Sequence, residues 1–297
     1  MQLLPAGWDA RYFQLIFQSI FLGYGLLYLH WSADWWLYAT YFLVSICTHF
    51  LFEVIKCRHR FMASYSVCMQ QIGKGLPSVW ISSFGLVLLL KTNHLYVAAL
   101  AAFVAISSKY ILRLNGKHIF NPSALGIAAA VVLTGKAWFS PGQWGSGAVL
   151  SFAGVCLGVI VVTRVQHLDV SLAFAGTFAA LLFIRQIVFL QWPLDYFFQS
   201  ISTGSLLLFS FFMITDPKTT PNHPVARMLW AMLIAAVSFY LTTFRFINGA
   251  PVWALLFAQP LVPLLDGLFK SKKFEWHTKP YPVQFSNYPF SNKPTLH

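Results

Sequence analysis

Charged side chains are scarce in this sequence. They make up 9% of its 297 residues, and Asp and Glu together account for only 8 of them. Hydrophobic residues make up 58% and occur in long blocks, without the alternating or one-sided patterns of a soluble core. This composition excludes an ordinary water-soluble globular protein and predicts an integral membrane protein.

Several chemical signatures are also missing. The sequence has no nucleotide-binding fingerprint, no cluster of metal ligands and no nucleophile–base pair, so the chain alone is not expected to oxidise NADH. Its 4 cysteines form no recognisable motif, and we expect no disulfide framework. The net charge of +12 is spread over short loops between apolar blocks, whereas nucleic-acid-binding proteins gather basic residues on one face. Nucleic acid is therefore not an expected partner.

The apolar blocks are long enough to serve as membrane spans. The sequence predicts an all-α integral membrane protein with about ten transmembrane helices. The expected spans lie near residues 12–30, 34–52, 76–90, 95–112, 119–134, 148–163, 170–191, 196–215, 228–244 and 251–268. They form a transmembrane domain, 1–268, with halves 1–135 and 148–268, followed by a cytoplasmic tail, 269–297.

The basic residues predict the orientation. Of the 20 Lys and Arg residues, all but four fall in alternate segments, which the positive-inside rule assigns to the cytoplasm. The four on the other side are Lys91, Lys136, Arg185 and Arg245. Both termini are therefore expected in the cytoplasm, and the protein in a bacterial inner membrane.

Two pairs of segments resemble each other. Residues 112–127 and 244–260 each contain a basic residue, then Asn-Gly, then an apolar segment with proline. Residues 82–93 and 202–216 each run from small residues through a leucine-rich block to a polar edge. These pairs predict a 5+5 inverted repeat with broken half-helices, an architecture that places a binding site where short helices end.

One such end is expected at the start of the fifth span, "GKHIFNPSALG". Asn121 suits the N-cap, Pro122 the first helical position, and Ser123 adds a hydroxyl. Helix N-termini attract anions, phosphates and electron-rich ring oxygens. Capping alone also explains these residue types, so both interpretations stand.

Three carboxylates have two interpretations each. Asp216 ends the eighth span and could neutralise a cation or hold a cofactor hydroxyl, or simply mark the interface, with Lys218, Arg227 or Lys109 as its partner. Asp266 could lie on an ion path or pair with Lys270. Glu53 lies four residues after His49, so the two are expected on one helix face, either as a hydrogen-bonded pair or as a haem or metal ligand pair, for which no second histidine is placed.

Several of these stretches resemble the NqrB/RnfD family, the ten-helix membrane subunits of the sodium-translocating NADH:quinone reductase and the Rnf electron-transport complex. The similar stretches are "NGKHIFNPSALGI", "TGSLLLFSFFMITDPKTTP" and "LVPLLDGL", in matching order. The resemblance implies electron transfer through flavin or quinone, with cation transport. It implies a cofactor site that includes Asn121, Pro122, Ser123, Gly204, Ser205, Thr215, Asp216 and Thr219, and an ion path through Asp216 and Asp266.

The sequence departs from the family at the flavin anchor. Family members attach FMN to a threonine on a long segment between spans 5 and 6, but here the connection is "GKAWFSPGQWGSG", which has no threonine. Covalent FMN is therefore not expected on this chain, and the cofactor would be a dissociable flavin (FMN or riboflavin) or a quinone.

The sequence thus predicts an RnfD/NqrB-like membrane subunit, non-catalytic alone, that docks partners carrying flavin or iron–sulfur centres. One alternative is a channel or transporter for a small solute or flavin, because inverted repeats with half-helices are transport architecture. A second is an accessory membrane protein of an enediyne-type biosynthetic cluster, by resemblance to shortened relatives.

Overall fold

The computed structural model describes residues 10–31, 34–59, 65–139 and 167–271, and almost all of its regular structure is helical. The first set of helices comprises α1 (Ala10–Leu27), α2 (Trp35–His59), α3 (Tyr65–Leu89), α4 (Leu95–Ile111) and α5 (Pro122–Thr134). The second comprises α7 (Leu168–Phe183), η2 (Ile184–Phe189), α8 (Leu194–Ile201), α9 (Gly204–Leu208), η3 (Phe209–Met213), α10 (Pro224–Thr243), α11 (Ala250–Ala258), η4 (Gln259–Leu261) and α12 (Val262–Leu268).

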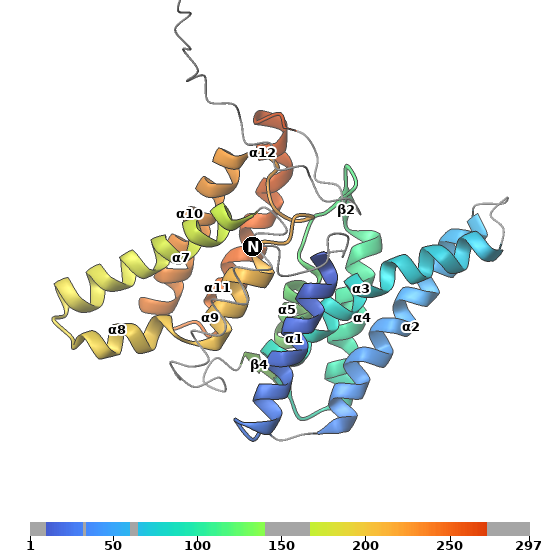
Figure 1. Cartoon of the computed structure of the whole chain (residues 1–297), viewed down its shortest axis with the longest axis horizontal. Coiled ribbons are helices and arrows are strands. Elements are labelled where there is room, and N and C mark those ends of the chain that lie inside the picture. The colour runs from blue at the N-terminus through green and yellow to red at the C-terminus, as the bar shows by residue number, and fades with distance from the viewer. Residues whose placement is uncertain (1–9, 32–33, 60–64, 140–166, 272–297) are drawn as a thin grey trace, which may run out of the picture.

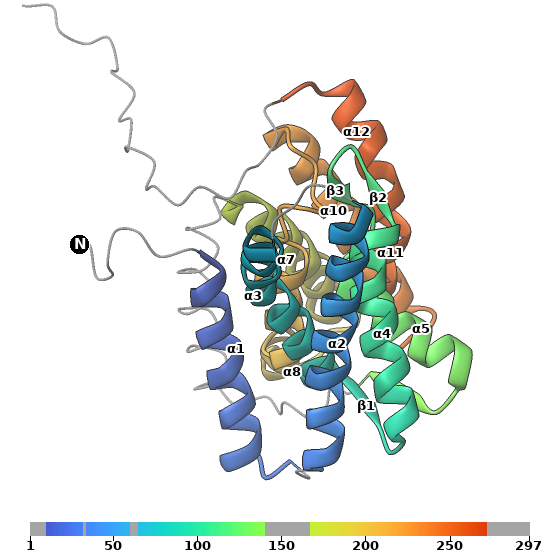
Figure 2. The same ribbon diagram turned by 90° about the vertical axis from the view of Figure 1, so that its right-hand side faces the viewer.

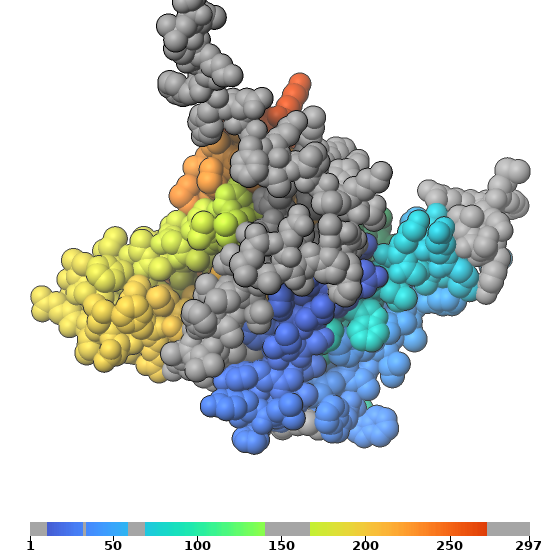
Figure 3. Space-filling model, viewed as in Figure 1, coloured from blue at the N-terminus to red at the C-terminus, as the bar shows by residue number. Residues whose placement is uncertain are grey.

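The two sets of helices form two groups (Figure 1). In the first, α4 packs against both α2 and α5; in the second, α10 packs against both α7 and α11. The short helices α5 and α11 contact each other where the groups meet. In the space-filling view, α7 and α8 project to one side and α2 and α3 to the other (Figure 3).

The structure also contains two short antiparallel β-ribbons. The all-α prediction did not include these strands. β1 (Leu90–Thr92) pairs with β4 (Ala137–Phe139), and β2 (Arg113–Leu114) pairs with β3 (Lys117–His118). The ribbons lie at opposite ends of the molecule, with β2 and β3 at the end reached by α12 (Figures 1 and 2). They therefore mark the two ends of the helical body.

Five helical segments are long and apolar enough to cross a membrane, by length and composition, or six if one bent pair counts as a span. The five are Trp35–Arg58, Met69–Leu89, Leu168–Phe189, Pro224–Thr243 and Ala250–Leu268; the bent pair is Leu194–Ile201 with Gly204–Met213, at 47°. α4 and α5 are shorter apolar helices. The number ten thus stays a prediction, and the expected span at 148–163 lies outside the described residues.

Two details differ from the sequence-based expectation. α3 begins at Tyr65, before the predicted span at 76–90, and contains Pro77 within the helix. Cys57 is disulfide-bonded, although no cysteine motif indicated a pairing.

The helix ends follow local chemistry. α5 starts with Asn121 as N-cap and Pro122 in its first turn, and stops at Gly135, whose φ of 61° is left-handed. α11 starts after Gly249, with φ 68°, and carries Pro251 in its first turn. At Gly249 a side chain would also meet the Phe139 ring at 2.4 Å. Both ends of α5 and the start of α11 are therefore specified by local sequence, while α11 continues through η4 and α12 to Leu268.

Candidate functional site

The N-terminus of α5 is tied to the second group of helices through Asn121. Its side-chain oxygen accepts a hydrogen bond from the Ala124 amide (3.1 Å), which caps the helix. Its side-chain nitrogen donates to the Met213 carbonyl (3.4 Å), and its backbone amide donates to Gln259 Oε1 (3.0 Å). The capping interpretation is thus confirmed, and the same side chain also joins two broken helices.

The partner of this end is the C-terminal end of η3. η3 is a π-helix, a form that is frequently found at functional sites. Thr215 Oγ1 donates to the Phe211 carbonyl (2.6 Å). Asp216 then starts a turn in which its carboxylate accepts from the Lys218 amide (3.0 Å) and its carbonyl accepts from the Thr219 amide (3.0 Å).

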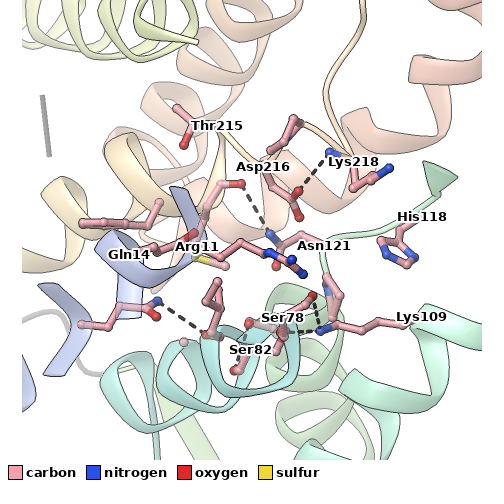
Figure 4. A pocket seen from close by; sticks show the side chains of 18 of the residues that line it. Arg11, Gln14, Ser78, Ser82, Lys109, His118, Asn121, Thr215, Asp216 and Lys218 are labelled. Atoms are coloured by element: carbon pink, nitrogen blue, oxygen red, sulfur yellow. Dashed lines mark hydrogen bonds between the residues drawn. The ribbon is translucent and has the colours of Figure 1, made fainter. Parts of the chain in front are cut away.

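Between these two ends lies a small cavity of about 80 Å³, here called the Asn121–Asp216 pocket. Its wall includes Asn121, Pro122, Ser123, Thr215 and Asp216, five of the predicted cofactor residues; Figure 4 shows Asn121, Thr215 and Asp216 among the labelled side chains. Ser123 donates to the Ser82 carbonyl (3.0 Å). Segments far apart in the sequence are therefore brought together as predicted, although their role in binding is a separate question.

The electrostatics of this pocket are dominated by cations. Arg11, Lys109 and Lys218 line it together with Asp216, the one acidic residue among the described residues of its lining (Figure 4). Lys109 is buried at the last turn of α4 and donates to the carbonyl and hydroxyl of Ser78 (2.6 and 3.1 Å). Nitrogen donors and positive charge suit an anionic or electron-rich group.

Burial raises the pKa of Asp216, and the Lys218 amide and the nearby lysines Lys109, Lys218 and Lys117 counteract this rise. Burial also lowers the pKa of His118 to about 3, with Lys109 contributing, so its imidazole is neutral near pH 7. Asp216 therefore keeps its proton to a higher pH than an exposed aspartate does.

The remaining predicted residues do not line this pocket. Gly204 and Ser205 are at the end of the α9–η3 segment that is far from Asp216. Ser205 lines a second cavity of about 310 Å³, the Ser205–Asn248 pocket, whose wall is largely apolar and includes Phe178 and Phe209. Thr219 is buried and bonded to the Asp216 carbonyl. The predicted single cofactor site is therefore divided between two cavities.

The expected partners of two carboxylates are partly wrong. Asp266 pairs with Lys117 (2.8 Å), not with Lys270, and also accepts from the Asn222 amide (2.8 Å). Arg227 pairs with Asp169 (2.5 Å) and is not the partner of Asp216. In both cases the partner comes from a segment far away in the sequence, which helix spacing does not reveal.

Sequence reasoning missed three residues that build the site. Ser78 and Gln18 line the Asn121–Asp216 pocket, and Gln259 orients Asn121 from η4. Each is a polar residue inside an apolar segment, and that is the signal by which they could have been found.

This arrangement defines a class: an integral membrane protein with many helices, in which short helices end within the helical body around cavities. Residues 132–275 match the sequence model of the NQR2, RnfD, RnfE family. This match confirms the family resemblance, and it covers the helices from the end of α5 onward.

Curated relatives agree with this family. The chain is 25% identical over 178 residues to the D subunit of the ion-translocating oxidoreductase complex of Stutzerimonas stutzeri, covering 56% of this chain and 48% of the relative. It is 31% identical over 72 residues to the D subunits of the same complex in Aeromonas hydrophila and Aeromonas salmonicida, covering 24% of this chain and 21% of each relative. The chain thus spans less than half of the length of these relatives.

Proposed function

We propose that this chain is an RnfD/NqrB-like membrane subunit of an electron-transport complex, which passes electrons through a dissociable flavin or quinone. The observation that carries the proposal is the Asn121–Asp216 pocket, where two broken helices, one from each group, meet at a cation-rich cavity. The relatives named as subunits of ion-translocating oxidoreductase complexes support the same function.

The pocket suits a group that becomes electron-rich on reduction. When bound, a flavin or quinone accepts and releases electrons, and its carbonyl oxygens gain negative charge on reduction. Lys109, Arg11 and Lys218 would stabilise that charge, because positive groups in a water-poor site interact strongly with it. The Asp216 carboxyl, whose pKa is raised, would hold and release a proton beside the same cavity.

The cavity sizes limit how such a ligand is held. The Asn121–Asp216 pocket, at about 80 Å³, admits a carbonyl edge or a phosphate but not a whole ring system, since ligand pockets usually measure roughly 300 to 1,000 Å³. The Ser205–Asn248 pocket, at about 310 Å³ with aromatic walls, has room for a ring. We therefore assign a carbonyl edge or a phosphate of the redox ligand to the Asn121–Asp216 pocket. The Ser205–Asn248 pocket is a second, separate site that suits an apolar ring.

The proposed 5+5 inverted repeat is supported by equivalent packing. If α2, α4 and α5 correspond to α7, α10 and α11, then each middle helix packs against the other two in both groups. The Asn-Gly turns before α5 and before α11 also correspond, with left-handed glycines at Gly116 and Gly249. The sixth predicted span, which would complete the second half, lies outside the described residues.

The proposed orientation agrees with the two ribbons. Lys91 and Lys136 lie at the β1–β4 end, proposed to be outside, whereas Arg113 and Lys117 lie at the β2–β3 end, proposed to be cytoplasmic. Both termini would then be cytoplasmic in a bacterial inner membrane, and partner subunits carrying flavin or iron–sulfur centres would exchange electrons with this chain.

A transporter for a small solute or flavin is the second candidate, favoured by the broken helices themselves. Purified protein distinguishes the two. A redox subunit should carry a flavin or quinone that is recovered by extraction, and Lys109→Met should lower the reduction potential of that ligand, while the exposed Lys74→Met serves as control. Protein without a redox ligand that moves solute into liposomes would support transport instead.

A further inference from the structure

A second polar cluster lies away from both cavities, between α2, α3 and α4, which pack together (Figure 1). His49 and Glu53 on α2 are buried, with exposed fractions of 3% and 8%. Tyr110 of α4 stands between them: its hydroxyl oxygen is 2.5 Å from His49 Nδ1, and it donates to Glu53 Oε1 at 3.1 Å. His49 and Glu53 are therefore joined as predicted on one helix face, but each is hydrogen-bonded to the Tyr110 hydroxyl and not to the other.

The hydrogen-bond donors of this cluster determine its proton content. His49 Nε2 lies 3.1 Å from the Ile72 carbonyl, which can only accept, so Nε2 carries a hydrogen. If Nδ1 also carries one, it donates to Tyr110, and Tyr110 donates to an ionised Glu53. If Nδ1 carries none, Tyr110 donates to His49, and a protonated Glu53 donates to Tyr110.

These two forms hold the same number of protons. They differ by the transfer of one hydrogen from Nδ1 to the tyrosine oxygen and of the tyrosine hydrogen to Glu53 Oε1, so one proton moves between the ends with no other reactant. With one proton fewer, the Tyr110 hydrogen can serve only one neighbour and one bond is lost. All three hydrogen bonds therefore require one proton beyond neutral histidine and ionised glutamate.

Burial favours the same proton count, because that count makes the cluster electrically neutral. The charged groups near it are Lys56 on α2, 3.6 Å from Glu53, Lys109 on α4 and Arg113 on β2. On α3, Lys74 is exposed. Glu53 Oε2 is buried and has no hydrogen-bond partner among the described residues, which is costly for an ionised carboxylate and mild for a neutral one.

We propose that Glu53, Tyr110 and His49 form a proton-binding site that takes up one proton and passes it between Glu53 and His49 through the tyrosine hydroxyl. Its ligand is the proton itself, and the Lys56 side chain, 43% exposed, places the Glu53 end near the surface of the helical body. The site does not depend on the electron-transport proposal.

The packing around the cluster keeps the three groups aligned. The Tyr110 ring stacks on Phe52 with centroids 4.8 Å apart and planes 6° from parallel. The imidazole of His49 occupies the space of a side chain at position 75, where an added Cβ would clash with its Cε1. The relay geometry is thus fixed by Gly75 and Phe52.

The test follows both ends of the site in the purified full-length chain in lipid nanodiscs. Infrared spectroscopy across a pH series reports the carboxylic acid C=O band of Glu53, assigned by its loss in Glu53→Gln. The sequence contains one other glutamate, Glu275, so Glu275→Gln is the matched control. Ring ¹⁵N NMR of labelled histidine, assigned with His49→Asn, reports the other end.

In the wild type, the Glu53 band and the second proton of His49 should disappear together in one macroscopic step, because the proton belongs to the pair. Tyr110→Phe keeps the stack on Phe52 but removes the relay, and should split this step into two. A Glu53 that is ionised and a His49 that is neutral at every pH would show a merely structural hydrogen-bond network and overturn the proposal. So would independent titration in the wild type, or a single step that persists in Tyr110→Phe.

Discussion

Removing the Asn121 side chain should destabilise the junction between the two helix groups by an amount that the structure defines. Asn121→Ala deletes the cap bond to Ala124 and the bond to the Met213 carbonyl, while the backbone bond to Gln259 remains. Loss of an N-cap costs about 0.5 to 2 kcal/mol. The Met213 bond is long at 3.4 Å and adds about 0.5 kcal/mol, at the low end for a neutral bond. The expected loss is therefore about 1 to 2.5 kcal/mol.

Thermal unfolding in nanodiscs measures this loss, with Asn93→Ala in an exposed turn as the matched control. Asn121→Ser separates the two bonds, since serine still caps the helix but cannot reach Met213, and should recover most of the stability. Wild-type stability in Asn121→Ala would refute the capping argument. If ligand binding is lost while stability is unaltered, Asn121 contacts the ligand directly.

Further predictions concern charge, backbone and topology. Because burial raises the pKa of Asp216, the folded state holds this proton more tightly than the unfolded chain, so the free energy of unfolding should fall as pH rises above the ordinary aspartate range. Asp216→Asn should remove this fall, as measured by unfolding across a pH series. The same variant should abolish turnover in the assembled complex, and unchanged turnover would refute the functional role of Asp216. Gly249→Ala should destabilise the protein by at least about 1 kcal/mol in the same unfolding assay, because φ is 68° and the new Cβ would meet the Phe139 ring; a neutral effect would contradict the described turn. In a background without other cysteines, Asn93→Cys should react with an impermeant thiol reagent from outside the cell and Lys270→Cys should not, and the reverse pattern would invert the proposed orientation.

The sequence predicted most of the helical architecture because helix ends and apolar blocks are local properties. Asn121 with Pro122, and the apolar block that stops at Asp216, were each identified from neighbouring residues, and the structure brings them to one cavity. Pairings between distant segments could not be predicted in this way. Lys117 with Asp266, and Tyr110 between His49 and Glu53, depend on how helices pack, which a single sequence does not state.

The division of the predicted cofactor residues has the same origin. Residues 204–216 form one stretch of sequence, but a helical segment places its two ends at two different cavities. The sequence assigned these residues to one site, and only the three-dimensional structure separates Ser205 from Asp216.

The central claim is that this chain carries a dissociable redox ligand, and the most direct measurement is the identity of the small molecules extracted from the purified protein or its complex. The account predicts a flavin or quinone that is released on denaturation, while the 33.5 kDa band stays non-fluorescent on a denaturing gel. A fluorescent band at that mass would show a covalent flavin and contradict the absence of an anchor. A fully assembled complex from which neither flavin nor quinone is extracted would contradict the electron-transfer function itself.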